Sequence, residues 1–245
     1  MSIFLAGQGE SGENPAVIAG FLGEAQRLAT SAGRTRPRIA VVVVADEHST
    51  YGTPAERVAG ITELLSAHGA ADVVPVTAPE GGVVEASLCA HNDGILVAGG
   101  HTPSYAAALG ASATVIRDLV SGGAPYLGFS AGAAIVAERA LVGGWLIGGV
   151  PVAPEAASEN RAEVSIVEGL GLIDLTVDVH AAQWGTLTRV IAAVEAGLIT
   201  EGIAIDENTA LVVGQGALRV VGSGSVWRVR ASEAGVLVSS LGATE

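Results

Sequence analysis

PYLGFSAGAAI, at residues 125–135, is the stretch that decides the fold. An apolar run, Tyr126–Phe129, reads as a buried strand that ends at Ser130, and a second apolar run, Ala133–Ala140, reads as a helix. Ser130 is the centre of a G-x-S-x-G pattern, which in a strand–turn–helix context is typical of a nucleophile elbow. Its glycines allow a sharp turn, and the N–H groups that open the helix favour developing negative charge on the serine. The alternative is an ordinary strand–helix turn in which Ser130 only caps the helix.

Short apolar runs alternate with helical stretches on both sides of this motif. This alternation predicts an α/β fold with a mostly parallel sheet and helices on both faces. Strands are expected at Ser2–Ala6, Arg38–Ala45, Asp72–Val76, Gly94–Ala98 and Pro125–Phe129. Helices are expected after Asn14-Pro15, from Thr53-Pro54 to about His68, after Thr102-Pro103, and over Thr186–Ala196.

The C-terminal part has a different pattern. Residues 202–240 hold closely spaced β-rich runs separated by glycines, which predicts an antiparallel extension at the sheet edge or an added small sheet. Residues 143–163 are rich in Gly, Pro, Ala and Glu and are interpreted as a loop excursion. We expect residues 1–245 to form a single domain.

Composition excludes several kinds of chemistry. The chain has 25 acidic and 12 basic residues, a net charge of −13, and all twelve basic residues are arginine. Without lysine there is no Schiff-base lysine, Ser–Lys dyad or Walker A lysine, and the single cysteine excludes an internal disulfide or a cysteine-based metal site. The acidity argues against nucleic-acid or anionic-membrane partners. Residues 1–5 read as a strand and not as a signal peptide, so we expect a cytoplasmic protein. The serine chemistry considered next needs no metal or cofactor.

A serine nucleophile requires a base and an orienting acid. His180 ends the apolar run Leu175–Val179, and the carboxyl ends of parallel strands share the edge that carries Ser130. Glu207 stands in a polar break between two apolar runs, while Asp174 and Asp178 are competing acids close to His180. A structural histidine and a solvated β-turn are the simpler interpretations of His180 and of the Asp206-Glu207 pair. The remaining histidines are His48, His68, His91 and His101.

An oxyanion hole needs two backbone N–H donors. Ala131, directly after the serine, offers one, and Gly99-Gly100, directly after a strand, offers the other. A rival motif is the G-x-G-x-x-G at Gly7–Gly12, which occurs in dinucleotide-binding enzymes. The acidic candidate for a ribose at the end of the second strand, Asp46, comes 34 residues after Gly12 instead of about 20, so this match is weak.

Four stretches resemble the cyanophycinase and dipeptidase E group of serine peptidases, peptidase family S51. They are ILVAGG at 95–100, PYLGFSAGAAI at 125–135, GLGLIDLTVDVH at 169–180 and GIAIDENTALVV at 202–213. The last two stretches resemble cyanophycinases more closely than they resemble dipeptidase E. The resemblance implies a class I glutamine-amidotransferase-like fold, a Ser130–His180–Glu207 triad and a homodimer.

The segment around His180 departs from the cyanophycinase pattern. Val179, Trp184 and Thr186 stand where that group has Gln, Arg and Arg, and His101-Thr102 replaces a polar pair that ends in Gln. The expected substrate-binding residues are therefore His101, Gln183, Trp184 and Arg189, in a pocket altered away from an acidic substrate. We expect hydrolysis of a small peptide, isopeptide or amide bond. The alternatives are a binding or regulatory protein that has lost catalysis and, third, a dinucleotide-binding enzyme.

Overall fold

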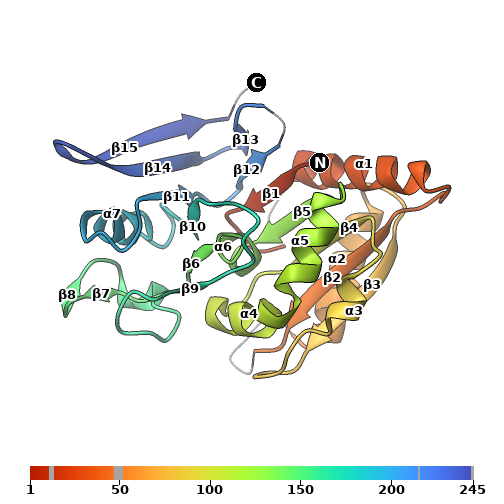
Figure 1. The fold of residues 1–245 in the computed structure, drawn as a ribbon, viewed down its shortest axis with the longest axis horizontal. Helices are drawn as coiled ribbons and strands as arrows, with labels where there is room; N and C mark the ends of the chain where they lie inside the picture. Colours follow the sequence, from red (N-terminus) through yellow and green to blue (C-terminus); the bar gives the residue numbers. More distant parts are fainter. Residues whose placement is uncertain (11–13, 47–51, 215, 244–245) are drawn as a thin grey trace.

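The computed structural model describes residues 1–10, 14–46, 52–214 and 216–243, and its largest element is a seven-stranded sheet (Figure 1). In spatial order its strands are β13 (Arg219–Gly222), β12 (Thr209–Val213), β1 (Ile3–Ala6), β5 (Tyr126–Phe129), β4 (Gly94–Val97), β2 (Arg38–Val44) and β3 (Asp72–Ala78). The five strands from β1 to β3 are parallel, whereas β12 and β13 pair antiparallel at the β1 edge. The predicted mostly parallel α/β sheet is confirmed.

The direction of each crossover places the helices on two faces of this sheet. The helices are α1 (Pro15–Ser31), α2 (Pro54–Ser66), α3 (Ala86–Cys89), α4 (Thr102–Leu109) and α5 (Ala113–Ser121), with a 3-10 turn, η1 (Gly110–Ser112), before α5. From β1 to β2 and on to β3 the chain moves one way across the sheet, and from β3 to β4 and β5 it moves back. Right-handed crossovers therefore put α1 and α2 on one face and α3, α4 and α5 on the other. Figure 1 shows α4 and α5 in front of the sheet and α2 behind it.

Sequence signals account for the start of α2 and for the burial of β2. Thr53 and Glu56 form a reciprocal capping box, and Pro54 occupies the first turn, where its missing N–H costs nothing. Every side chain in Ile39–Val44 is at most 1% exposed, as expected for a parallel strand covered on both faces.

A second, four-stranded sheet holds most of the C-terminal part. Its strands, in spatial order, are β10 (Thr176–Val179), β11 (Glu201–Ile205), β14 (Ser225–Ser232) and β15 (Gly235–Gly242). One face adds Val177, Ile203 and Val226 to the core of the main sheet, and the other packs against α7 (Leu187–Glu195). Both predicted alternatives therefore occur together, since β12 and β13 extend the main sheet while β14 and β15 build the added one.

The prediction of a helix over Ala133–Ala140 is wrong. The helix α6 covers only Ala131–Ala134, and the chain then enters β6 (Arg139–Leu141), which pairs antiparallel with β9 (Ile166–Glu168). The backbone between them bonds to the segment before β10, with Leu170 N–H donating to the Ile135 carbonyl and Glu138 N–H to the Ile173 carbonyl. A short apolar run fits a buried helix or a buried strand equally well, so tertiary pairing decides.

The 143–163 excursion contains a two-stranded ribbon, β7 (Leu146–Ile147) with β8 (Val150–Pro151), followed by a 3-10 turn, η2 (Glu155–Ala157). Figure 1 shows it beside α4 at the end of the molecule that also holds α7. The Glu159 carboxylate accepts hydrogen bonds from the Thr102 N–H and hydroxyl, at 3.2 Å each, and thereby ties the excursion to the start of α4. The burial of this carboxylate raises the pKa of Glu159.

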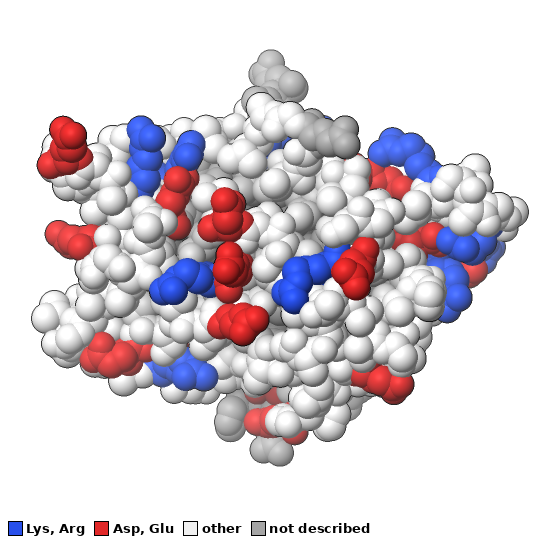
Figure 2. All heavy atoms as spheres, in the orientation of Figure 1, with Lys and Arg blue, Asp and Glu red and all other residues white. Residues whose placement is uncertain are grey.

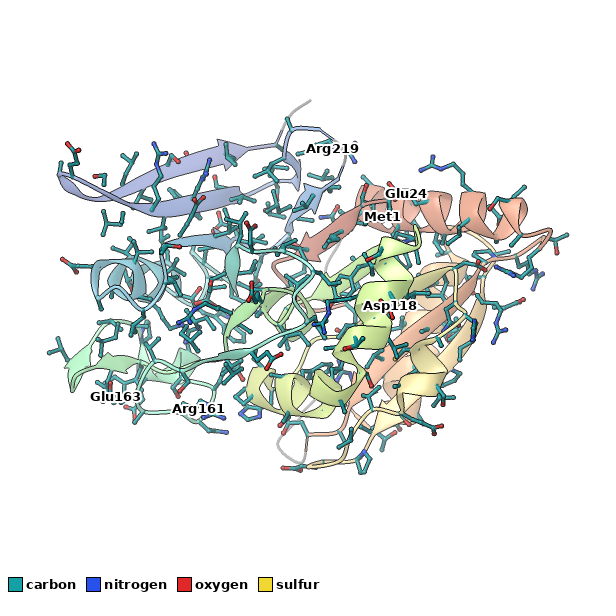
Figure 3. All side chains as sticks on the ribbon, viewed as in Figure 1. Met1, Glu24, Asp118, Arg161, Glu163 and Arg219 are labelled. Carbon is teal, nitrogen blue, oxygen red and sulfur yellow. The ribbon has the colours of Figure 1, made fainter. Side chains whose placement is uncertain are left out.

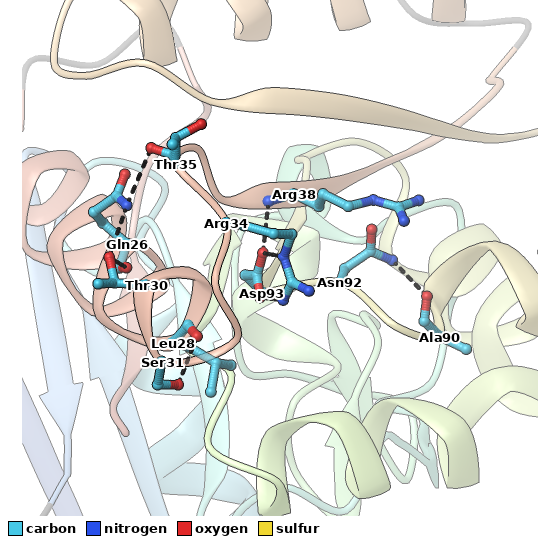
Figure 4. Close-up of polar contacts among 10 residues, drawn as sticks. All are labelled: Gln26, Leu28, Thr30, Ser31, Arg34, Thr35, Arg38, Ala90, Asn92 and Asp93. Carbon is cyan, nitrogen blue, oxygen red and sulfur yellow. Dashed lines mark hydrogen bonds and ion pairs between the residues drawn. The ribbon is translucent and has the colours of Figure 1, made fainter.

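The amino-terminal edge of the parallel strands is held by Asp93 (Figure 4). Its carboxylate accepts from the Arg38 N–H at 2.9 Å and from the Arg34 guanidinium, and the side chain is almost fully buried. This contact joins the starts of β2 and β4, whose opposite ends face the site described next.

Charged side chains of both signs are mixed on the face shown in Figure 2, where the blue arginines are scattered among red carboxylates. Across the described ranges, no helix has both the length and the apolar character needed to cross a bilayer.

Candidate active site

Ser130 occupies a strained turn between β5 and α6. Its backbone has φ 46° and ψ −108°, a sparsely populated region for a residue with a side chain. A methyl group on Gly128 would overlap the Gly132 carbonyl, and one on Gly132 would overlap the Val97 carbonyl. The two glycines of the motif are therefore required by close backbone approach, as in a nucleophile elbow.

His180 reaches Ser130 from the second sheet. Its Nε2 lies 2.8 Å from the Ser130 Oγ. His180 has a φ of 55°, and its N–H donates to the Gly7 carbonyl at 3.2 Å, which fixes the end of β10 against the loop after β1. The imidazole is thus positioned by backbone from both sheets.

Glu207 completes a hydrogen-bonded chain of three side chains. Its Oε1 lies 2.7 Å from the His180 Nδ1, and its own N–H donates to the Gln183 Oε1 at 2.9 Å. Asp178, the competing acid, is engaged elsewhere, since its carboxylate accepts two hydrogen bonds from Arg189, at 2.8 and 3.0 Å.

The environment of His180 favours the neutral imidazole. Burial lowers the pKa of His180 below its usual value, although the Glu207 carboxylate opposes that shift. Trp184 contributes to the burial, because its ring stacks on the imidazole with centroids 3.9 Å apart and planes 8° apart. A neutral imidazole can accept a proton, which a general base must do.

The expected oxyanion donors lie close to Ser130. Ala131 is the first residue of α6, so its N–H has no carbonyl partner within the helix. Gly99 also borders the serine, since a Cβ built on it would lie 3.2 Å from the Ser130 Cβ. Its N–H, however, donates to the Glu10 Oε2 at 3.2 Å, and its carbonyl accepts from the Arg57 Nη2 at 2.9 Å. Gly100 has a φ of +139°, a conformation that favours glycine.

A cleft of about 1190 Å³ opens onto Ser130, His180 and Trp184. Six acidic residues line it: Glu10, Asp46, Glu56, Glu63, Glu155 and Glu159. Arg57 also lines the cleft, where it is paired with Glu10. The side-chain view in Figure 3 draws Arg161 on the excursion, and this residue is not among those that line the cleft.

The four predicted substrate-binding residues have different surroundings. His101 lines the cleft, with Nδ1 2.7 Å from the Ser104 hydroxyl and Nε2 3.0 Å from the Glu159 carbonyl. Trp184 lines it too and is 42% exposed. Gln183 instead contacts the backbone of Glu207.

Arg189 is not brought to the cleft. It is buried and bonded to Asp178, and its Nη1 donates to the Gly144 and Ala157 carbonyls, at 3.0 and 2.6 Å. Its contacts join α7 to β10 and to the excursion. The position of Arg189 in the sequence does not predict these contacts, because its partners are distant along the chain.

Sequence reasoning missed Glu10 and Arg57. Glu10 follows β1 at the same sheet edge as Ser130, and this position indicates a residue at the site, although the glycines around it match a dinucleotide-binding motif. Gly7 of that motif packs tightly on the backbone of Ile205 and Asp206, so its lack of a side chain serves the contact between the two sheets. Ser11 and Gly12 of the motif, and also His48, lie outside the described residues.

Within the described part of the chain, no group of three or more His, Cys, Asp or Glu side chains is arranged to hold a metal ion. The side chains that meet at Ser130 are those of hydrolytic chemistry in which serine, imidazole and carboxylate act in sequence.

Comparison with known proteins places this chain in a family. The family model of peptidase family S51 matches residues 24–221, so the chain belongs to that family. A cyanophycinase of Trichormus variabilis is 38% identical over 122 residues, which are 49% of this chain and 38% of that protein. A cyanophycinase of Synechococcus elongatus is 40% identical over 101 residues, 40% of this chain and 29% of that protein. The resemblance inferred from the four sequence stretches is confirmed at the level of the family.

A solved structure of a peptidase has a fold similar to that of this chain. The crystal structure of a peptidase from an acI-B1 Actinobacterium covers 100% of this chain, and the chain covers 95% of it, with a TM-score of 0.65 at 19% identity.

Proposed function

We propose that this protein is a serine peptidase or amidase that hydrolyses a small peptide, isopeptide or amide bond through Ser130, His180 and Glu207. The observation that carries the proposal is the continuous contact from the Ser130 Oγ through both imidazole nitrogens to the Glu207 carboxylate, at 2.8 and 2.7 Å. Membership of peptidase family S51 supports it.

In the first half-reaction, the Ser130 Oγ attacks the substrate carbonyl carbon while His180 Nε2 takes the hydroxyl proton. The negative oxygen of the tetrahedral intermediate is held by Ala131 N–H and by the Gly99-Gly100 backbone. The intermediate collapses as His180 returns the proton to the leaving amine, which leaves an acyl ester on Ser130. Water then attacks this ester by the same proton path and releases the acid. Glu207 holds the Nδ1 proton and stabilises the imidazolium throughout.

We further propose that the pocket disfavours an acidic group at the cleaved position. A carboxylate is best held by a positioned guanidinium. Arg189 is engaged with Asp178, and Arg57 in the cleft is paired with Glu10. Six acidic residues and one arginine line the cleft, so its acidic excess repels an anionic substrate. Trp184 lines the cleft and is 42% exposed, and its aromatic side chain suits neutral, apolar or aromatic groups.

The wider setting is also proposed, as a cytoplasmic homodimer without a nucleic-acid partner. The net charge of −13 supports the last point.

The test is a screen of dipeptides, β-linked dipeptides and amino-acid amides, together with labelling by a fluorophosphonate. Ser130→Ala and His180→Ala should each lower the rate by about 10⁴- to 10⁶-fold while the fold stays intact. Ser121→Ala, which removes an exposed hydroxyl that donates to the carbonyl of Arg117, is the matched control. Retained turnover by pure Ser130→Ala would refute the proposal. A chain that folds but is neither labelled nor active would support the binding or regulatory alternative.

A further inference from the structure

The Gly99-Gly100 backbone is held by an ion pair that belongs to neither the Ser130 elbow nor the His180–Glu207 contact. Glu10, after β1, accepts the Gly99 N–H at 3.2 Å. Arg57, on α2, donates to the Gly99 carbonyl at 2.9 Å, and its Nε lies 3.1 Å from the Glu10 Oε1. Arg57 is 7% exposed, so its side chain has little contact with solvent although it lines the cleft.

These contacts discriminate between the two glycine donors. The carbonyl of one residue and the N–H of the next point in opposite directions across a planar trans peptide. Arg57 holds the Gly99 carbonyl, so the Gly100 N–H on the same peptide plane points away from the guanidinium. The Gly99 N–H already has a carboxylate partner, and a second negative oxygen at that donor would be repelled by Glu10.

We propose that Glu10 and Arg57 are positioning residues for the oxyanion hole, and that Gly100 N–H is the donor that acts with Ala131 N–H. This inference rests on the proposed function. Gly99 lies against the nucleophile, so a rotation of its peptide by loss of either contact displaces the donor from the developing charge. Small misplacements of a catalytic group cost rate steeply.

A blocking role for Glu10 would change the reaction rate in the opposite direction. If the carboxylate blocks Gly99 N–H in the free protein and substrate displaces it, then removing the carboxylate speeds the reaction. If Glu10 fixes the backbone, then removing it slows the reaction.

The experiment measures the second-order rate of Ser130 labelling by a fluorophosphonate, whose phosphoryl oxygen takes the oxyanion position. The variants are Glu10→Ala, Glu10→Gln and Arg57→Met, with Glu233→Gln as a charge-matched control in an exposed turn outside the cleft. We expect labelling about 10- to 100-fold slower in Glu10→Ala and Arg57→Met. Glu10→Gln should fall between these and the wild type, because its amide oxygen still accepts from Gly99 while its charge is lost.

Two further measurements, thermal unfolding and hydrogen exchange at the Gly99 amide, distinguish a role in positioning the oxyanion hole from a general loss of structure. All rates are measured well below each variant's unfolding midpoint, and Glu10→Gln, which keeps the shape of the side chain, serves if the alanine variant does not fold. Amide exchange by NMR should be slow at Gly99 in the wild type and faster in a folded Glu10 variant. Wild-type rates in Glu10→Gln and Arg57→Met, or faster labelling in any Glu10 variant, would overturn the inference while leaving the proposed function in place. Failure of the wild type to label at Ser130 would overturn both.

Discussion

Asp178 and Glu207 provide a test in which one acid should affect catalysis and the other stability. Glu207→Gln keeps the size of the side chain but removes the charge that holds the Nδ1 proton of His180. The 2.7 Å contact can then be made with the wrong imidazole tautomer, in which Nε2 carries the proton and cannot accept one from Ser130. Loss of this anchor costs about 10⁴-fold in kcat in related chemistry, which is the size we expect.

Asp178→Asn should act on folding. Asp178 and Arg189 are each 3% exposed and bonded to one another, so the substitution leaves a buried guanidinium without its counter-charge. Breaking a buried pair in this way costs about 3–5 kcal/mol. For a domain of this size that lowers the unfolding midpoint by roughly 6–20 °C.

The assay pairs kcat/KM on a substrate found in the screen with thermal unfolding of the same preparations. Glu207→Gln should unfold close to the wild-type temperature, since its side chain is partly exposed. Asp178→Asn should retain most of its activity at a temperature where it is folded. An inactive but folded Asp178→Asn beside a nearly wild-type Glu207→Gln would show that the acid has been misassigned.

Two further predictions concern pH and substrate charge. Trp184→Ala should move the acid limb of kcat/KM to higher pH, because burial lowers the pKa of His180 and loss of the stacked ring hydrates it; Trp184→Phe should move it less. A shift to lower pH would show instead that the ring mainly stabilises the imidazolium. Matched substrates that differ only at the cleaved position should favour Leu over Asp, and added salt should narrow the difference because it screens the carboxylates that line the cleft. An Asp substrate tenfold better than its Leu analogue would reveal a guanidinium in the pocket.

The sequence predicts the positions of Ser130 and His180 because a local motif and the direction of the strands both point to the same edge of the sheet. The G-x-S-x-G motif placed Ser130 in a turn because only glycine fits the backbone contacts on either side of it. His180 followed from the rule that parallel strands end at one edge, although its strand, β10, belongs to the second sheet. That edge is shared because the His180 N–H bonds to the loop after β1.

The errors come from contacts between distant parts of the chain. The run after Ser130 is apolar enough for a helix. The helix nevertheless ends at Ala134, because the backbone that follows forms hydrogen bonds with the segment 169–173. Arg189 is expected near a substrate because it remains in the segment after His180 where cyanophycinases carry arginines. Its carboxylate partner is in β10 and its carbonyl partners are in the excursion, and no local pattern encodes either contact.

The two neighbouring acids Asp206 and Glu207 show why residue type alone does not assign a catalytic role. The Asp206 carboxylate is buried and accepts from the Ala182 N–H, the Ser225 N–H and the Trp227 ring N–H, at 3.1, 2.9 and 3.1 Å. With three donors satisfied, it fixes the loop after His180 to the turn after β11. Glu207, one residue on, is thereby presented to the imidazole with its side chain partly exposed. Asp206 therefore has the surroundings of a structural anchor, and we propose Glu207 as the acid that takes part in proton chemistry, a division that depends on which donors surround each carboxylate.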